Sequence, residues 1–137
     1  ELDEESVAGL LVLGRVHATR GDADKALEWF DLAVATGSDD GSTWWWRGRF
    51  FRDVLRIGHL ALDDFNKAIE LAPAQAALYI DRALLYIQAE AEKELARADL
   101  EEAISLAQDP KLPSIIERAD ELLAILDQRE ADARIPK

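Results

Sequence analysis

The chain has 137 residues, of which 49% are apolar and 32% are charged, as is typical of a single helical domain. It contains no cysteine, which excludes a disulfide framework and a thiolate metal site. Its net charge of -12 argues against DNA or RNA as the main ligand, because phosphate binding needs a positive face. The sequence shows neither a long apolar run nor a signal-peptide pattern, so we expect a cytoplasmic location without membrane contact. Because methionine is absent, we expect the chain to be a segment of something longer.

Hydrophobic spacing, together with glycine and proline stops, predicts six helices in three pairs. The pairs cover about residues 6–38, 42–73 and 76–109 of one domain, 1–137. In the second pair we expect the first helix to run from about Thr43 to Ile57 and to be closed by Gly58.

A seventh helix is predicted at about residues 114–131. Ser114 and Glu117 form a capping-box pattern at its start, and an amphipathic stripe follows them. We expect this helix to cap the open end of the helix pairs.

One helix recurs three times along the chain. The copies begin at Ala26, Ala61 and Ala96, and each has a bulky residue four positions later, followed by alanine and an aliphatic residue. The copies are therefore 35 residues apart. A period of this length is typical of stacked-repeat arrays, which hold a surface in place for a partner.

With this spacing the chain resembles the tetratricopeptide repeat (TPR) family over nearly its full length. The residues that carry the resemblance are Leu10, Leu13, Gly14, His17, Gly21, Ala26, Phe30 and Ala33, then Trp44, Gly48, Phe51, Ala61, Phe65, Ala68 and Pro73, then Tyr79, Ala83, Tyr86, Ala96, Leu100 and Ala103. The second and third pairs have one extra residue between the small residue and the alanine. The resemblance implies an all-α solenoid of antiparallel helix pairs, in which the first helix of each pair lines a concave groove that holds a peptide.

Basic residues gather on the first helix of the second pair. Trp45, Arg49, Arg52 and Arg56 follow one another at helical spacing, one residue displaced from a stripe that we expect to face the core. The resemblance places this row toward the groove, and Trp and Arg are the residue types most often found as binding hot spots. Like charges at this spacing invite an acidic partner, which is either internal or external.

By the same resemblance the groove continues on the neighbouring first helices. The residues expected there are Leu11 and Arg15 on one side, and Ile80, Leu84, Ile87 and Gln88 on the other. Trp46 is expected to serve packing. Some TPR relatives bind chaperone tails with a clamp of side chains. The corresponding positions here hold Leu11, Arg15, Trp46, Ala77 and Asp81, so the binding of chaperone tails is not supported.

The sequence offers few candidate catalytic residues. His17 occupies a packing position and His59 has no evident partner, so we expect neither an enzyme nor a bound metal or cofactor. The sequence predicts a protein–protein interaction scaffold that binds a peptide or protein segment, with acidic groups on the partner. Two alternatives stay open: the arginines are merely solvated or internally paired, or the chain is a structural or self-association module, either a monomer or a homodimer.

Overall fold

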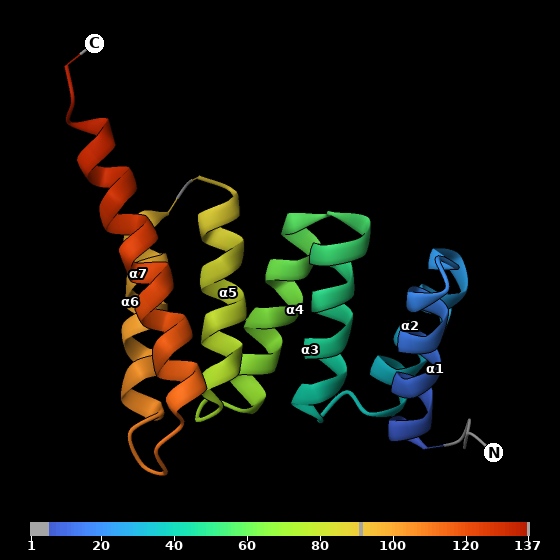
Figure 1. Ribbon diagram of the computed structural model, residues 1–137. Helices are drawn as coiled ribbons and strands as arrows, with labels where there is room; N and C mark the ends of the chain where they lie inside the picture. Colours follow the sequence, from blue (N-terminus) through green and yellow to red (C-terminus); the bar gives the residue numbers. More distant parts are fainter. Residues whose placement is uncertain (1–5, 91, 137) are drawn as a thin grey trace. The chain divides into compact units, whose positions relative to one another are not determined.

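The computed structural model describes residues 6–90 and 92–136, and these form an all-α structure. Three antiparallel helix pairs, α1/α2, α3/α4 and α5/α6, are followed by a capping helix α7 that packs on α5 and α6 (Figure 1). The predicted fold class is therefore confirmed. The helices are α1 (Val7–Thr19), α2 (Ala23–Thr36), α3 (Gly41–Phe50), α4 (Gly58–Leu71), α5 (Ala76–Gln88), α6 (Lys93–Leu106) and α7 (Pro113–Ala133), with a π-helical turn η1 (Phe51–Leu55) after α3.

The contacts between Cα atoms divide the chain into two compact units, Glu1–Pro73 and Ala74–Lys137. The first unit holds two helix pairs, and the second holds one pair with α7. None of the helices in the described residues combines the length and apolar character that a membrane-spanning helix requires.

Two glycines let the helices of the first unit approach closely. A Cβ atom on Gly14 would lie 2.8 Å from the ring of Phe30, and one on Gly48 would lie 2.9 Å from the ring of Phe65. Both phenylalanines are buried in the core, where neighbouring atoms leave them no room to move. The corresponding positions of the third repeat hold Ala83 and Leu100, so a larger residue on one helix accompanies a smaller one on the other.

After α3 the helix widens for one π-helical turn, η1. Arg56 follows with a left-handed backbone (φ 56°) and closes the helix, and the N–H of Ile57 donates to the carbonyl oxygen of Phe51. The expectation that Gly58 closes this helix is wrong, because the π turn ends it two residues earlier, and Gly58 instead begins α4.

In the second unit, α7 covers α5 and α6 with one apolar stripe. Ala119, Leu122 and Leu126 of this stripe are buried. The predicted capping box does not form: α7 begins at Pro113, a residue earlier than Ser114, and no side chain caps it. Proline suits the first helical position because it lacks the N–H that would be unpaired there.

Candidate functional site

Arg47 of the second repeat is held inside the structure by two carboxylates. Its Nε and Nη2 donate to the two carboxylate oxygens of Asp64, both at 2.9 Å, and its Nη1 donates to Asp31 at 3.0 Å. Asp64 is almost fully buried, with 4% of its side chain exposed. A forked pair of this kind fixes the distance and rotation between α3 and α4.

The same pair recurs in the third repeat, where Arg82 donates to both oxygens of Asp99 at 2.8 and 2.7 Å. In both repeats the aspartate follows the arginine by 17 residues. Sequence reasoning missed this pair, although an arginine and an aspartate at one fixed spacing in two repeats were a usable signal.

The electrostatics of the Arg47 pair reflect its burial. Hydrogen bonding to Asp64 raises the pKa of Arg47, so the guanidinium stays charged. Burial raises the pKa of the Asp64 carboxyl above its usual 3.8, and Arg47 opposes that shift. Arg47 is therefore what makes an ionised Asp64 tolerable in the core, which gives this arginine a structural role.

The predicted row of Trp45, Arg49, Arg52 and Arg56 is broken by η1. Arg52 lies in the π turn, where its Nε and Nη2 donate to Asp53 at 2.8 and 3.1 Å and only 7% of its side chain is exposed. Arg56 is exposed at the helix end. An internal acidic partner, one of the two possibilities for this row, is therefore present for Arg52.

Arg15 and Arg49 behave differently, because they stack on tryptophans. The guanidinium of Arg15 lies 4.1 Å from the ring centroid of Trp46, and that of Arg49 lies 5.0 Å from Trp46 and 5.4 Å from Trp45. The two indole centroids are 5.3 Å apart. We call these four residues, Arg15, Trp45, Trp46 and Arg49, the Arg–Trp cluster.

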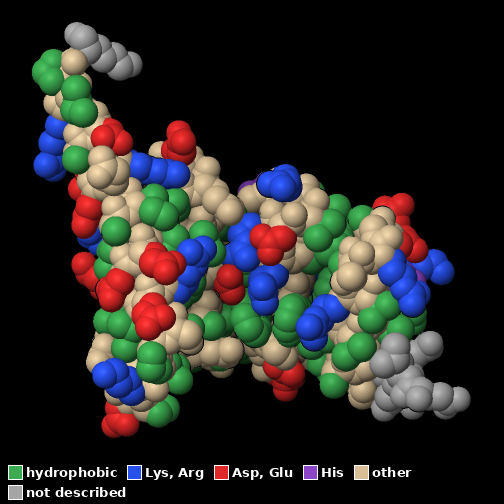
Figure 2. Space-filling model, in the orientation of Figure 1, with side chains coloured by type: hydrophobic (Ala, Val, Ile, Leu, Met, Phe, Trp, Pro, Cys, Tyr) green, Lys and Arg blue, Asp and Glu red, His purple; other side chains and the backbone are tan. Residues whose placement is uncertain are grey.

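The two arginines of the Arg–Trp cluster form no ion pair with any carboxylate that the structure describes. The Nε atom of Arg49 is buried and lacks a hydrogen-bond acceptor among those residues. Stacking on an indole leaves the edge of a guanidinium, with its donors, open to an anion. On the face drawn in Figure 2, basic side chains lie beside both acidic and apolar ones over α3.

A surface hollow of about 200 Å³ adjoins the Arg–Trp cluster. Arg15, Trp46, Arg49 and Asp53 line it together with apolar side chains of α1, α2, α3 and η1. This arrangement can accept an anionic group beside an apolar one. Trp46 both lines the hollow and packs against the core cluster that contains Leu10 and Phe30, in keeping with its predicted packing role.

The remaining predicted residues differ in their exposure. Leu11, Ile80 and Ile87 are buried, Leu84 is half-buried and Gln88 is exposed. Six of the predicted ligand residues lie in the first unit: Leu11, Arg15, Trp45, Arg49, Arg52 and Arg56. The other four, Ile80, Leu84, Ile87 and Gln88, lie in the second unit. His17 packs at the end of α1, with its Nδ1 3.7 Å from Asp22. In residues 6–90 and 92–136, no three His, Asp or Glu side chains gather closely enough to hold a metal ion.

Comparison with known proteins links the chain to one fold. No protein-family model and no curated protein sequence matches it. Among solved structures, the TPR2B domain of yeast Sti1 in a complex with pHsp70 is 21% identical with a TM-score of 0.80, over 90% of this chain and 97% of that one. The first TPR of Spaghetti (RPAP3), bound to the HSP90 peptide SRMEEVD, is 19% identical with a TM-score of 0.77, over 95% and 97%.

Two further complexes share the same arrangement of helices. The Yersinia enterocolitica type III secretion chaperone SycD, with a peptide of the translocator YopD, is 16% identical with a TM-score of 0.80 over 95% of this chain and 98% of that one. PcrH, with the chaperone-binding region of PopD, is 20% identical with a TM-score of 0.75 over 96% of each chain. At these identities the likeness concerns the fold, and the chain has the tetratricopeptide-repeat fold that its spacing predicts.

Proposed function

We propose that the protein is an interaction scaffold that binds a peptide or protein segment, and that the Arg–Trp cluster holds an acidic group of that segment. The observation that carries the proposal is the pair of guanidinium groups, Arg15 and Arg49, stacked on Trp46 without a described carboxylate partner. In a protein of net charge -12, two cations without a described carboxylate partner favour an anionic ligand, because the one carboxylate that lines the hollow, Asp53, is already paired with Arg52.

The solved structures of the same fold support a peptide as the ligand. Those of Sti1, RPAP3, SycD and PcrH each contain a bound protein segment or peptide, and the RPAP3 peptide SRMEEVD carries three acidic side chains. The cytoplasmic location expected from the sequence belongs to the same proposal.

The Arg–Trp cluster defines what the segment should contain. Trp46 lines the hollow and offers contact area to an apolar side chain, and Arg15 and Arg49 offer donors for a neighbouring carboxylate. The proposed motif is therefore an acidic residue next to an aromatic or aliphatic one. Hot-spot residues of these types are typically worth about 2 kcal/mol or more when they are truncated.

An arrayed peptide library provides the test. One set of ten-residue peptides carries Asp or Glu beside an apolar residue, a matched set has Asn and Gln in their place, and SRMEEVD is included as a chaperone-tail probe. We expect the protein to retain acidic members in preference to their amide counterparts. Binding should weaken as salt rises, because the cluster is partly exposed and its charges are screened.

The variant Arg15→Gln/Arg49→Gln should lose the preference for acidic peptides. Lys25→Gln is the matched control, since Lys25 is an exposed cation on α2 of the same unit and does not line the hollow. Equal retention of acidic and amide peptides by the unmodified protein would refute the proposal. So would a loss of binding in Lys25→Gln as large as in the double variant. Light scattering on the same samples reports whether the protein is a monomer or a homodimer.

A further inference from the structure

A second hollow, of about 270 Å³, lies within the second unit where α5, α6 and α7 meet. Its walls come from the end of α5, the start of α6 and the last turns of α7, and its lining residues are Tyr86, Ile87, Glu90, Lys93, Ala96, Leu126 and Arg129. Small-molecule sites usually measure about 300–1,000 Å³, so this hollow suits a small group and not a folded partner.

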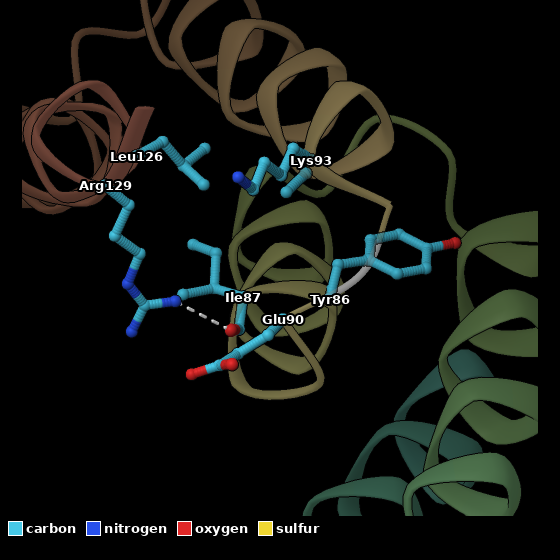
Figure 3. A pocket seen from close by; sticks show the side chains of 7 residues that line it. Tyr86, Ile87, Glu90, Lys93, Leu126 and Arg129 are labelled. Atoms are coloured by element: carbon cyan, nitrogen blue, oxygen red, sulfur yellow. Dashed lines mark hydrogen bonds between the residues drawn. The ribbon is translucent and has the colours of Figure 1, made fainter. Parts of the chain in front are cut away.

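The floor of this hollow is apolar and its rim is charged. Ile87, Ala96 and Leu126 are buried, and they supply the floor. Figure 3 shows Lys93 reaching from α6 toward Leu126, and Arg129 reaching from α7 to the end of α5. An apolar group with a polar end would match this division.

The charges on the rim favour an anion. Lys93 and Arg129 are basic and Glu90 is acidic, so these three residues sum to +1, although the chain as a whole carries -12. Neither Lys93 nor Arg129 forms an ion pair with the carboxylates that the structure describes. The Nη1 atom of Arg129 donates to the carbonyl oxygen of Ile87 at 3.0 Å. The other N–H donors of this guanidinium remain available to a ligand.

The start of α6 adds to this preference. Lys93 is the first residue of α6, and no side chain caps that end of the helix. The amino end of a helix carries a partial positive charge and unpaired N–H groups, which favour an anion nearby. The hollow therefore combines a helix end with two cationic side chains above an apolar floor.

We propose that this hollow binds a small aliphatic group that ends in a carboxylate. The carboxylate lies between Lys93 and Arg129, and the aliphatic part covers Ile87 and Leu126. Glu90 selects against a second negative charge on the ligand. The ligand is either a free carboxylic acid or the C-terminal residue of a peptide, since both present the same chemistry. This site lies in the other unit from the Arg–Trp cluster and does not depend on the function proposed for that cluster.

Backbone amide NMR of the full chain tests the proposal with four probes. Free leucine, 4-methylpentanoate and N-acetyl-glycyl-leucine share the carboxylate and the branched chain, and N-acetyl-glycyl-leucinamide lacks the carboxylate. We expect the three carboxylates to shift the amide signals of residues 86–90, 93–96 and 126–129 at millimolar concentration, and the amide probe to leave them in place. The tightest of the three identifies the source, because only the acetylated dipeptide imitates a peptide end.

Two variants distinguish a binding site from general charge attraction. Lys93→Gln should weaken the binding of 4-methylpentanoate about tenfold, because a hydrogen bond to a charged group is lost. Lys111→Gln, which removes an exposed cation from the same unit outside the hollow, should leave it unchanged. Shifts of equal size with the amide probe would overturn the proposal, as would the absence of shifts at about 20 mM probe. An equal loss of affinity in the two variants would overturn it as well.

Discussion

Replacing Arg47 by leucine should destabilise the first unit far more than removal of an ordinary surface charge. The substitution leaves Asp64 buried without its forked partner and close to the second carboxylate, Asp31. Removing one member of a buried ion pair typically costs about 3–5 kcal/mol, and Arg47 itself is only 18% exposed. We therefore expect Arg47→Leu to lose about 3–5 kcal/mol of the free energy of unfolding.

The double variant Arg47→Leu/Asp64→Leu should recover most of that loss. The first repeat already shows that an apolar pair is tolerated, because the corresponding positions hold Leu13 and Trp29. Replacement of a whole buried ion pair by apolar residues of similar volume is often close to neutral. The coupling energy between the two sites should then amount to several kcal/mol.

Urea unfolding followed by tryptophan fluorescence is the assay, because all four tryptophans of the chain lie in the first unit. Lys67→Leu is the matched control: Lys67 lies on α4 like Asp64, but its ion pair with Glu70 is exposed, and such pairs are worth about 0–1 kcal/mol. If Arg47→Leu costs no more than Lys67→Leu, or if the losses of Arg47→Leu and Asp64→Leu simply add in the double variant, the reasoning fails.

The loss in Arg47→Leu should also depend on pH. Burial raises the pKa of Asp64 above its unfolded value of 3.8, and without Arg47 nothing opposes burial. A group with a raised folded pKa stabilises the protein fully below its unfolded pKa and loses that contribution as pH rises through the folded pKa. The deficit of Arg47→Leu relative to the unmodified protein should therefore be smaller at about pH 4 than at pH 7. A deficit that grows on acidification would contradict this account.

Three further changes test other parts of the structure. Gly48→Ala should lose about 1–3 kcal/mol of the free energy of unfolding despite the better helix propensity of alanine, because its Cβ would lie 2.9 Å from the ring of Phe65. Adding Phe65→Leu should reduce this steric conflict, and chemical denaturation of the single and double variants measures both effects. Arg56→Gly should be about 1 kcal/mol more stable than Arg56→Ala by thermal unfolding, because φ is 56° at this position. Trp46→Leu should weaken binding of the acidic library peptides about tenfold or more in fluorescence anisotropy titrations, because Arg15 and Arg49 both stack on this ring.

The sequence by itself determined the helices and their pairing. Helix formation depends on residues three and four positions apart, and the recurrence of Ala26, Ala61 and Ala96 carries that local pattern through all three repeats. The small residues Gly14 and Gly48 lie where the sequence predicts close helix contact. The Arg47–Asp64 pair was also within reach of the sequence, because its spacing recurs 35 residues later in Arg82 and Asp99.

The tertiary structure decided which partners Arg15, Arg49 and Arg52 contact. Arg52 turns to Asp53 because the π turn alters the rotation of the chain after Phe51, and a stripe drawn for a regular helix no longer applies beyond that residue. Arg15 and Arg49 come together on Trp46 only because α1 packs against α3, a contact between residues about thirty positions apart.

The hollow at Lys93 and Arg129 likewise depends on a distant contact. Arg129 reaches the carbonyl oxygen of Ile87 across 42 positions of the sequence, after α7 has folded back on α5. Local periodicity specifies which face of a helix is apolar, but it does not specify which charged side chains meet at the edges of two packed helices. That choice follows from the packing of complete helices against one another, and it is there that both candidate sites arise.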